Sequence, residues 1–179
     1  MVFFELIAED QMAPEAREYV EIAKKRARSD RVADTTYVLA RNPRLVKALV
    51  QAAQELIPIP NRFGTVQGIA GMLISHAKGC RVCFDTSRNL LVKLGFDDAA
   101  LEGMCQAPAA LPLAERERRF VEFTLRVARD PQGLKPNDFQ EMERAGFSKD
   151  EILEMIGVAA YWNLATTLAS AVDAGLHEE

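Results

Sequence analysis

The chain has 179 residues, of which 49% are hydrophobic and 27% are charged, and its formal net charge at pH 7 is −4. This length suits one domain with a substantial core, and the composition excludes a disordered chain. The negative charge excludes a general attraction to nucleic acid or to an anionic membrane. We therefore expect a single globular domain over residues 1–179.

The first half of the chain has a helical pattern broken by prolines. A helix is predicted over residues 14–28, with Pro14 in its first turn, and one or two helices over residues 37–57, interrupted near Asn42 and Pro43. Pro58 and Pro60 exclude a helix over residues 57–64. This loop divides an N-terminal helical section, residues 1–57, from a second section over residues 64–175.

The second section begins with the uncharged segment 65–77, whose Gly68 and Gly71 permit close helix packing. A helix over residues 80–94 is predicted to end at Gly95, which suits a left-handed cap. After it we expect a short helix near residue 97, a helix around residues 120–128, and a helix over residues 137–145 that Gly146 caps. A capping box at residues 148–151 opens the last long helix. No stretch alternates as a strand does, so the predicted fold class is all-α.

The last helix raises the question of a membrane span, because residues 155–172 carry no charge. The segment is rich in alanine and contains several polar residues, and no basic residues flank it. We interpret it as a core or subunit-interface helix. Three cysteines, an odd number, favour a reducing compartment, and the N-terminus lacks the basic start of a signal peptide. The expected location is the cytoplasm, without membrane or nucleic-acid partners.

The chemistry of the chain is predicted to lie in the stretch SHAKGCRVCFDTSRN, residues 75–89. In one continuous helix, His76, Cys80, Cys83 and Ser87 share a narrow stripe. A break at Gly79 is the other possibility. Cys80 then begins the following helix, whose unpaired amide groups stabilise a thiolate.

Nearby charges act on the same thiols. Lys78 and Arg81 favour a thiolate, whereas Asp85 opposes it. His76 is the one imidazole that is close enough in sequence to act as a general base, although an ordinary hydrogen-bonding role remains open.

Three interpretations of the cysteine pair stay open at this point. The pair is a redox dithiol, or a zinc site with His76, or two small buried residues without chemistry. The zinc interpretation lacks a second pair of ligands. Cys105 is interpreted as a plain thiol. No metal, nucleotide or flavin motif is visible, and no cofactor is predicted.

The stretch resembles the signature of the carboxymuconolactone decarboxylase-like, alkylhydroperoxidase D-like superfamily. That signature runs Ser-x-x-x-Gly-Cys-x-x-Cys and reads SHAKGCRVC here, from Ser75 to Cys83. The later segments LPLAERERRFVEFTLRVARDP, AGFSKDEILEMI and YWN follow the family pattern as well. The resemblance covers about residues 45–175 and is greatest to the peroxidase-related members.

The resemblance implies an all-α helical bundle that assembles into dimers, trimers or hexamers. It also implies a thiol-dependent peroxidase that reduces hydroperoxides. In the family mechanism the second cysteine, here Cys83, attacks the peroxide and becomes a sulfenic acid. The first cysteine, here Cys80, resolves it to a disulfide, which a thiol or dithiol then reduces.

The sequence departs from the family where a glutamate and a histidine relay protons. Ser87 stands where the histidine is expected, Gly68 where the glutamate is expected, and Gln67 where a neighbouring arginine is expected. His76 or Asp85 would then be the substitute proton acceptor. The alternative function is a diverged redox-sensing or small-molecule-binding oligomer of the same fold.

Overall fold

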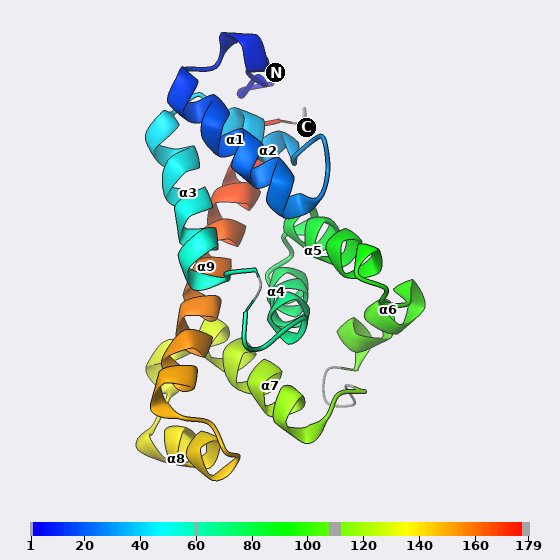
Figure 1. The fold of residues 1–179 in the computed structure, drawn as a ribbon, viewed down its shortest axis with the longest axis vertical. Coiled ribbons are helices and arrows are strands. Elements are labelled where there is room, and N and C mark those ends of the chain that lie inside the picture. Colours follow the sequence, from blue (N-terminus) through cyan, green and yellow to red (C-terminus); the bar gives the residue numbers. More distant parts are fainter. Residues whose placement is uncertain (1, 60, 108–111, 177–179) are drawn as a thin grey trace.

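The computed structural model describes residues 2–59, 61–107 and 112–176. These residues contain no strand, and they form helices that run in chain order as shown in Figure 1. The helices are α1 (Pro14–Ala27), α2 (Asp34–Leu39), α3 (Pro43–Leu56), α4 (Val66–Ala77), α5 (Arg81–Lys93), α6 (Asp98–Gln106), α7 (Glu115–Arg129), α8 (Pro136–Arg144) and α9 (Lys149–Asp173), with 3-10 turns η1 (Glu9–Gln11) and η3 (Pro131–Gly133). The all-α prediction is confirmed.

Most helix ends lie where proline, glycine and capping residues predicted them. Gly95 and Gly146 have φ values of +97° and +87° and follow α5 and α8. Ser148 caps α9 with the predicted capping box. Asn42 accepts a hydrogen bond from the Arg44 amide, so the segment predicted over residues 37–57 divides into two helices. The first of them, α2, begins three residues earlier than predicted, at Asp34.

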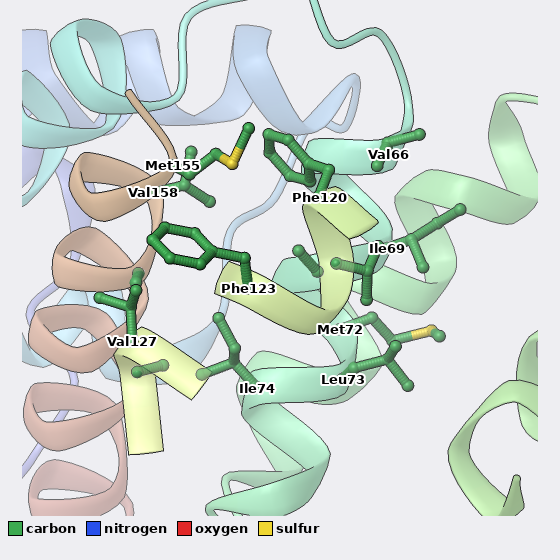
Figure 2. Packing of buried hydrophobic residues seen from close by; sticks show 14 of the residues in the cluster. Val66, Ile69, Met72, Leu73, Ile74, Phe120, Phe123, Val127, Met155 and Val158 are labelled. Carbon is green, nitrogen blue, oxygen red and sulfur yellow. The ribbon is translucent and has the colours of Figure 1, made fainter. Parts of the chain in front are cut away.

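The buried apolar residues form two clusters. The larger joins α4, α7 and α9, and it includes Ile69, Phe120 and Met155, which are at most 1% exposed (Figure 2). The smaller joins α1, α2 and α3, and the end of α9 reaches it through Val172. Helix α9 therefore contributes to both clusters, and it packs against α2, α3, α4, α5, α7 and α8.

Helix α9 is the one helix in the described part of the chain that is long and apolar enough to span a membrane, by length and composition alone. A third of its most apolar window is buried inside the chain. Its packing against six other helices agrees with the interpretation as a core helix. Leu153 and Leu164 remain exposed on its surface.

Glycine allows α4 and α9 to approach closely. The indole of Trp162, on α9, lies so near Gly71 that a Cβ atom there would overlap its ring atoms. A Cβ atom at Gly68 would lie 3.2 Å from the Leu91 side chain of α5, which is a tight contact. The two glycines predicted to permit close packing therefore contact different helices.

We expect Gly71→Ala to lower the free energy of unfolding by about 1–3 kcal/mol, because the indole must move out of a packed position. The matched control is Gly103→Ala in α6, where a Cβ atom meets nothing within 4 Å. That control should raise stability by up to about 1 kcal/mol through helix propensity alone. Urea denaturation followed by circular dichroism measures both changes. Equal effects of the two substitutions would contradict the packing role of Gly71.

Candidate active site

A tight turn between α4 and α5 positions the cysteine pair. Gly79 has a φ of +69°, and its amide donates to the His76 carbonyl at 3.0 Å. The Cys80 amide donates to the Ser75 carbonyl at 3.0 Å, which completes a Schellman ending of α4. The predicted break at Gly79 is confirmed. The continuous helix through His76 and Ser87 is wrong, because the glycine reverses the chain direction.

Cys80 and Cys83 form a disulfide at the N-terminus of α5, with their Cα atoms 5.4 Å apart. Cys80 is the N-cap residue and Cys83 lies in the first turn. The first amide of this helix to bond within it is that of Phe84, which donates to the Cys80 carbonyl at 2.9 Å. The amides of residues 81–83 precede that bond, as the first amides of any helix do. Cys80 is 2% exposed and Cys83 is 8% exposed.

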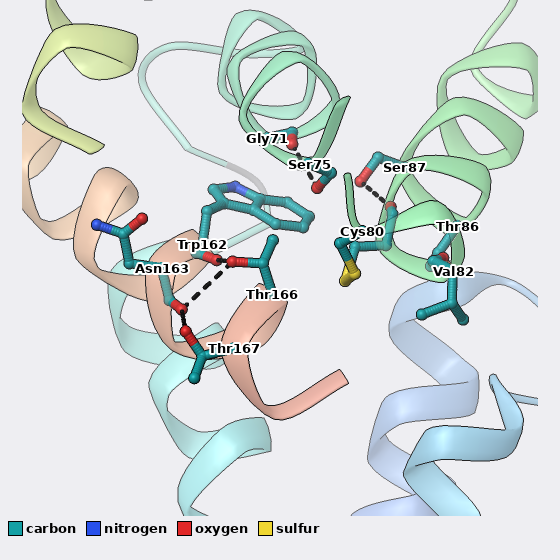
Figure 3. The surroundings of a disulfide bond; sticks show 11 residues. Gly71, Ser75, Cys80, Val82, Thr86, Ser87, Trp162, Asn163, Thr166 and Thr167 are labelled. Atoms are coloured by element: carbon teal, nitrogen blue, oxygen red, sulfur yellow. Dashed lines mark hydrogen bonds between the residues drawn. A yellow bond between two sulfur atoms is a disulfide. The ribbon is translucent and has the colours of Figure 1, made fainter. Parts of the chain in front are cut away.

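Hydroxyl groups surround the disulfide, and each donates to a backbone carbonyl (Figure 3). Ser75 donates to Gly71 at 2.8 Å, and Ser87 donates to Cys83 at 2.9 Å. Thr166 of α9 donates to Trp162 at 2.7 Å. A hydroxyl whose proton is used in this way has no hydrogen left to donate to a sulfur atom, and it does not ionise near neutral pH. These groups make the surroundings polar without adding a charge.

The other two predicted site residues lie at the surface. His76 is exposed at the end of α4, and its ring centroid lies 5.6 Å from that of Phe84. Asp85 is exposed on α5. The structure therefore brings Cys80, Cys83 and Ser87 together in a buried region and leaves His76 and Asp85 outside it. Their role as proton acceptors stays a prediction.

A cavity of about 630 Å³ lies beside the first turns of α5. Its lining includes Arg81 and Val82, the two residues between the cysteines, together with Asp85. The N-terminal residues around Phe4, the start of α2 and the end of α9 form the rest of the wall. This volume lies within the range of small-molecule sites.

The residues at the two other relay positions have structural roles. The Gln67 side chain is buried and donates to the Leu56 carbonyl at 3.3 Å, where α3 ends. Gly68 faces Leu91, and a side chain at this position would require the leucine to move slightly. The positions where the family has an arginine and a glutamate therefore hold the helices together here.

Cys105 lies apart from the disulfide, in α6, where its thiol donates to the Leu101 carbonyl at 3.5 Å. Burial raises the pKa of the Cys105 thiol and so disfavours its thiolate. This agrees with the predicted plain thiol. In the described residues no three His, Cys, Asp or Glu side chains gather to hold a metal ion, and sulfur atoms joined in a disulfide do not ligate zinc.

Trp162 and Thr166 are two site neighbours to which sequence reasoning gave no role. Both belong to the surroundings of the disulfide (Figure 3). The sequence had a signal for Trp162, because Gly71 lies four residues before Ser75 on the same face of α4. A glycine at such a position indicates the close approach of another element, but not which one.

No protein-family model and no curated protein matches the chain. Solved structures do match. An uncharacterized peroxidase-related protein from Ralstonia eutropha, described as an alkylhydroperoxidase AhpD core, aligns with a TM-score of 0.84 and 15% identity over 99% of this chain and 92% of its own. A peroxidase-related protein from Silicibacter sp. aligns with a TM-score of 0.81 and 18% identity over 96% of this chain and 90% of its own.

A third match is the debrominase Bmp8, solved alone and, as a cysteine-to-alanine variant, with 2,3,4-tribromopyrrole. Its TM-score is 0.78 at 16% identity, over 97% of this chain and 90% of its own. Identities this low establish similarity of fold. The chain has the alkylhydroperoxidase D-like fold, as its cysteine signature predicted.

Proposed function

We propose that this chain is a dithiol oxidoreductase that reduces hydroperoxides through Cys83 and Cys80. The observation that carries the proposal is the buried disulfide at the N-terminus of α5, on a fold shared with peroxidase-related proteins. Cys-x-x-Cys at a helix start is the geometry of dithiols that cycle with their disulfide. The protein acts as a cytoplasmic homo-oligomer, and a thiol or dithiol reduces it after each turnover.

Each step of the cycle balances. The Cys83 sulfur attacks the terminal oxygen of the hydroperoxide, the O–O bond breaks, and the alkoxide leaves and is protonated to the alcohol. Cys83 is then a sulfenic acid. The Cys80 sulfur attacks the Cys83 sulfur, and the hydroxyl group leaves as water with the Cys80 proton. Two thiols of the reductant return the disulfide to the dithiol.

The difference in exposure supports this division of roles. Cys83, at 8% exposed, is more open to an external reactant than Cys80, at 2%. An intermolecular reaction therefore begins at Cys83, and Cys80 completes the disulfide from within. The cavity beside residues 81 and 82 has room for the organic part of a small hydroperoxide.

A second candidate is reductive dehalogenation, which the structural similarity to a debrominase favours. The dithiol supplies the same two electrons. A carbon–bromine bond is replaced by carbon–hydrogen, bromide leaves, and the disulfide forms. The indole of Trp162, which lies in the surroundings of the disulfide, suits contact with an aromatic substrate.

We expect the reduced protein to convert hydroperoxides to alcohols with one disulfide formed per peroxide, and Cys83→Ser to abolish turnover. The panel includes hydrogen peroxide, tert-butyl hydroperoxide and cumene hydroperoxide, with a brominated pyrrole as the second substrate class. Trp162, the one tryptophan of the chain, reports formation of the disulfide through its fluorescence. Cys105→Ala is the matched control and should retain full turnover.

Turnover of the bromopyrrole alone would replace the first candidate with the second. Absence of turnover with every substrate, while the disulfide still forms and reduces reversibly, would contradict both. That result would support the redox-sensing or small-molecule-binding alternative.

Restoring the glutamate and histidine of the family's proton relay is expected to increase peroxidase activity. We expect Gly68→Glu with Ser87→His to accelerate peroxide-dependent disulfide formation, because together they supply the absent carboxylate and imidazole. Ser87 is 5% exposed, and a Cβ atom at Gly68 would lie 3.2 Å from Leu91, so the two larger side chains each cost about 1–3 kcal/mol of stability. The control Gly68→Glu with Ser87→Asn adds similar bulk without an ionisable ring. If the two double variants react equally fast, the absence of a base is not what limits the rate.

A further inference from the structure

We propose that the cavity beside α5 binds the reductant of the disulfide, and that this reductant is an amino-acid or peptide thiol held by its ammonium and carboxylate groups. This inference rests on the proposed dithiol cycle and names the chemical class of the thiol that completes it. The structure has Cys80 and Cys83 joined in a disulfide, so its cavity is the one that a reductant meets.

One face of α5 lines the cavity and begins between the two cysteines. Four of its residues are spaced i, i+3, i+4 and i+7 and so share one side of the helix: Val82, Asp85, Thr86 and Asn89. Figure 3 shows Val82 and Thr86 on the side of α5 that faces the blue ribbon of the N-terminal helices. Cys83 follows Val82 in the first turn. A molecule bound along this face therefore has one end near the disulfide.

The wall of the cavity has unpaired charges of both signs. Arg81 and Asp85 are one turn apart on α5, yet the structure shows no ion pair between them. Glu5, which the N-terminal segment contributes to the wall, has no ion pair with any described residue either. Arg81 is thus open to a carboxylate of a ligand, and Asp85 and Glu5 are open to an ammonium group.

The other two carboxylates of the wall are already engaged. Asp34, at the start of α2, pairs with Arg31 at 2.7 Å, and Asp173, at the end of α9, also has a partner. The charges that stay open to a ligand are therefore one cation and two anions. This combination suits a zwitterion better than a simple anion or a simple cation.

A buried hydroxyl group also opens into the cavity. Thr35, in the first turn of α2, lines the cavity and is only 4% exposed. Its hydroxyl makes no hydrogen bond with a described residue and is not sealed from solvent, so it is free to bond a polar group of a ligand. Phe4 and Leu176 add apolar surface. The volume of about 630 Å³ accommodates an amino acid or a short peptide.

Reduction of the disulfide balances with two molecules of thiol. The first attacks the Cys83 sulfur, the S–S bond breaks, and the Cys80 sulfur leaves and is protonated. A mixed disulfide then joins the reductant to Cys83. The second thiol attacks the sulfur of the bound reductant, and Cys83 leaves and takes a proton. The products are the dithiol and the disulfide of the reductant, which vacates the cavity for the next hydroperoxide.

Four forms of cysteine test the two charges separately, because they share one thiol scaffold. L-Cysteine has both charges, its methyl ester has only the ammonium, N-acetyl-L-cysteine has only the carboxylate, and N-acetyl-L-cysteine methyl ester has neither. Reduction of the Cys80–Cys83 disulfide is followed without peroxide, by alkylation and mass spectrometry. Each rate is divided by the rate of the same thiol with bis(2-hydroxyethyl) disulfide, which removes differences in thiol ionisation.

We expect L-cysteine to react roughly tenfold faster than the doubly blocked ester on this normalised scale. Each charge contributes about threefold, as expected for ion pairs at the protein surface. The two singly charged forms should have intermediate rates.

Substitutions in the wall assign each charge to its partner. Arg81→Gln should remove the preference for a carboxylate, and Asp85→Asn combined with Glu5→Gln should remove the preference for an ammonium group. Ratios between thiols are compared because a change at the start of α5 alters the rates of all thiols together. The matched controls Arg119→Gln and Glu102→Gln, exposed and outside the cavity, should leave both ratios unchanged within twofold.

Equal normalised rates for the four thiols would overturn the inference. So would a singly charged form that reacts faster than L-cysteine, or a preference that persists in the wall variants. Selectivity for L-cysteine in a protein that turns over no hydroperoxide would support the reductant site and contradict only the peroxidase proposal, since the measurement contains no peroxide.

Discussion

The turn at Gly79 is the constraint on which the rest of the site depends. Its φ of +69° is in the left-handed region, where a side chain is strained, and two amide–carbonyl bonds close the end of α4 around it. The reversal makes Cys80 the cap of α5 instead of a residue within a longer helix. A side chain at this position that disturbed the turn would move both cysteines away from the free amides.

Helix α9 completes the site from the other side. It is anchored in both apolar clusters, so its middle is fixed relative to α4 and α5. Gly71 lets the Trp162 indole lie against α4, and Thr166 follows one turn later. The result is a disulfide enclosed by hydroxyls and an indole. An enclosed site of this kind has a low dielectric, which strengthens the effect of any oriented amide on a nearby charge.

The sequence predicted the fold class and most helix ends because these depend on local chemistry. Pro14, Gly95 and the capping box at Ser148 act through their own backbone, and the structure has helix ends at each of them. It did not decide between a continuous helix and a break at Gly79, since both are locally allowed. The partner of Gly71, Trp162, lies 91 residues later in the chain. Contacts of that separation depend on how the helices pack, which periodicity does not specify.

The difference between local chemistry and long-range packing also explains how much of the candidate site could be predicted. The Cys-x-x-Cys spacing fixed which two sulfurs meet, because one helical turn brings residues 80 and 83 together. It did not show which residues surround them. His76 is four residues from Cys80, yet it lies at the surface because the turn intervenes. Nearness in sequence therefore gave His76 too much weight as a candidate base. Ser87 does lie near the sulfurs, but its hydroxyl cannot act as a base.

In the described part of the chain, no carboxylate or imidazole is among the buried residues of α4, α5 and α9, and this has a consequence for the chemistry of the dithiol. In a glutamate–histidine relay, the charge that activates the thiol comes from side chains that ionise on their own. Here the stabilising charge is the fixed partial charge of backbone amides, which does not titrate. In the proposed dithiol cycle, we therefore expect the reactivity of the pair to follow the ionisation of the two sulfurs. Because Gly68 and Gln67 serve helix packing, restoring the relay requires changes in the packing of α4 as well as a new base on α5.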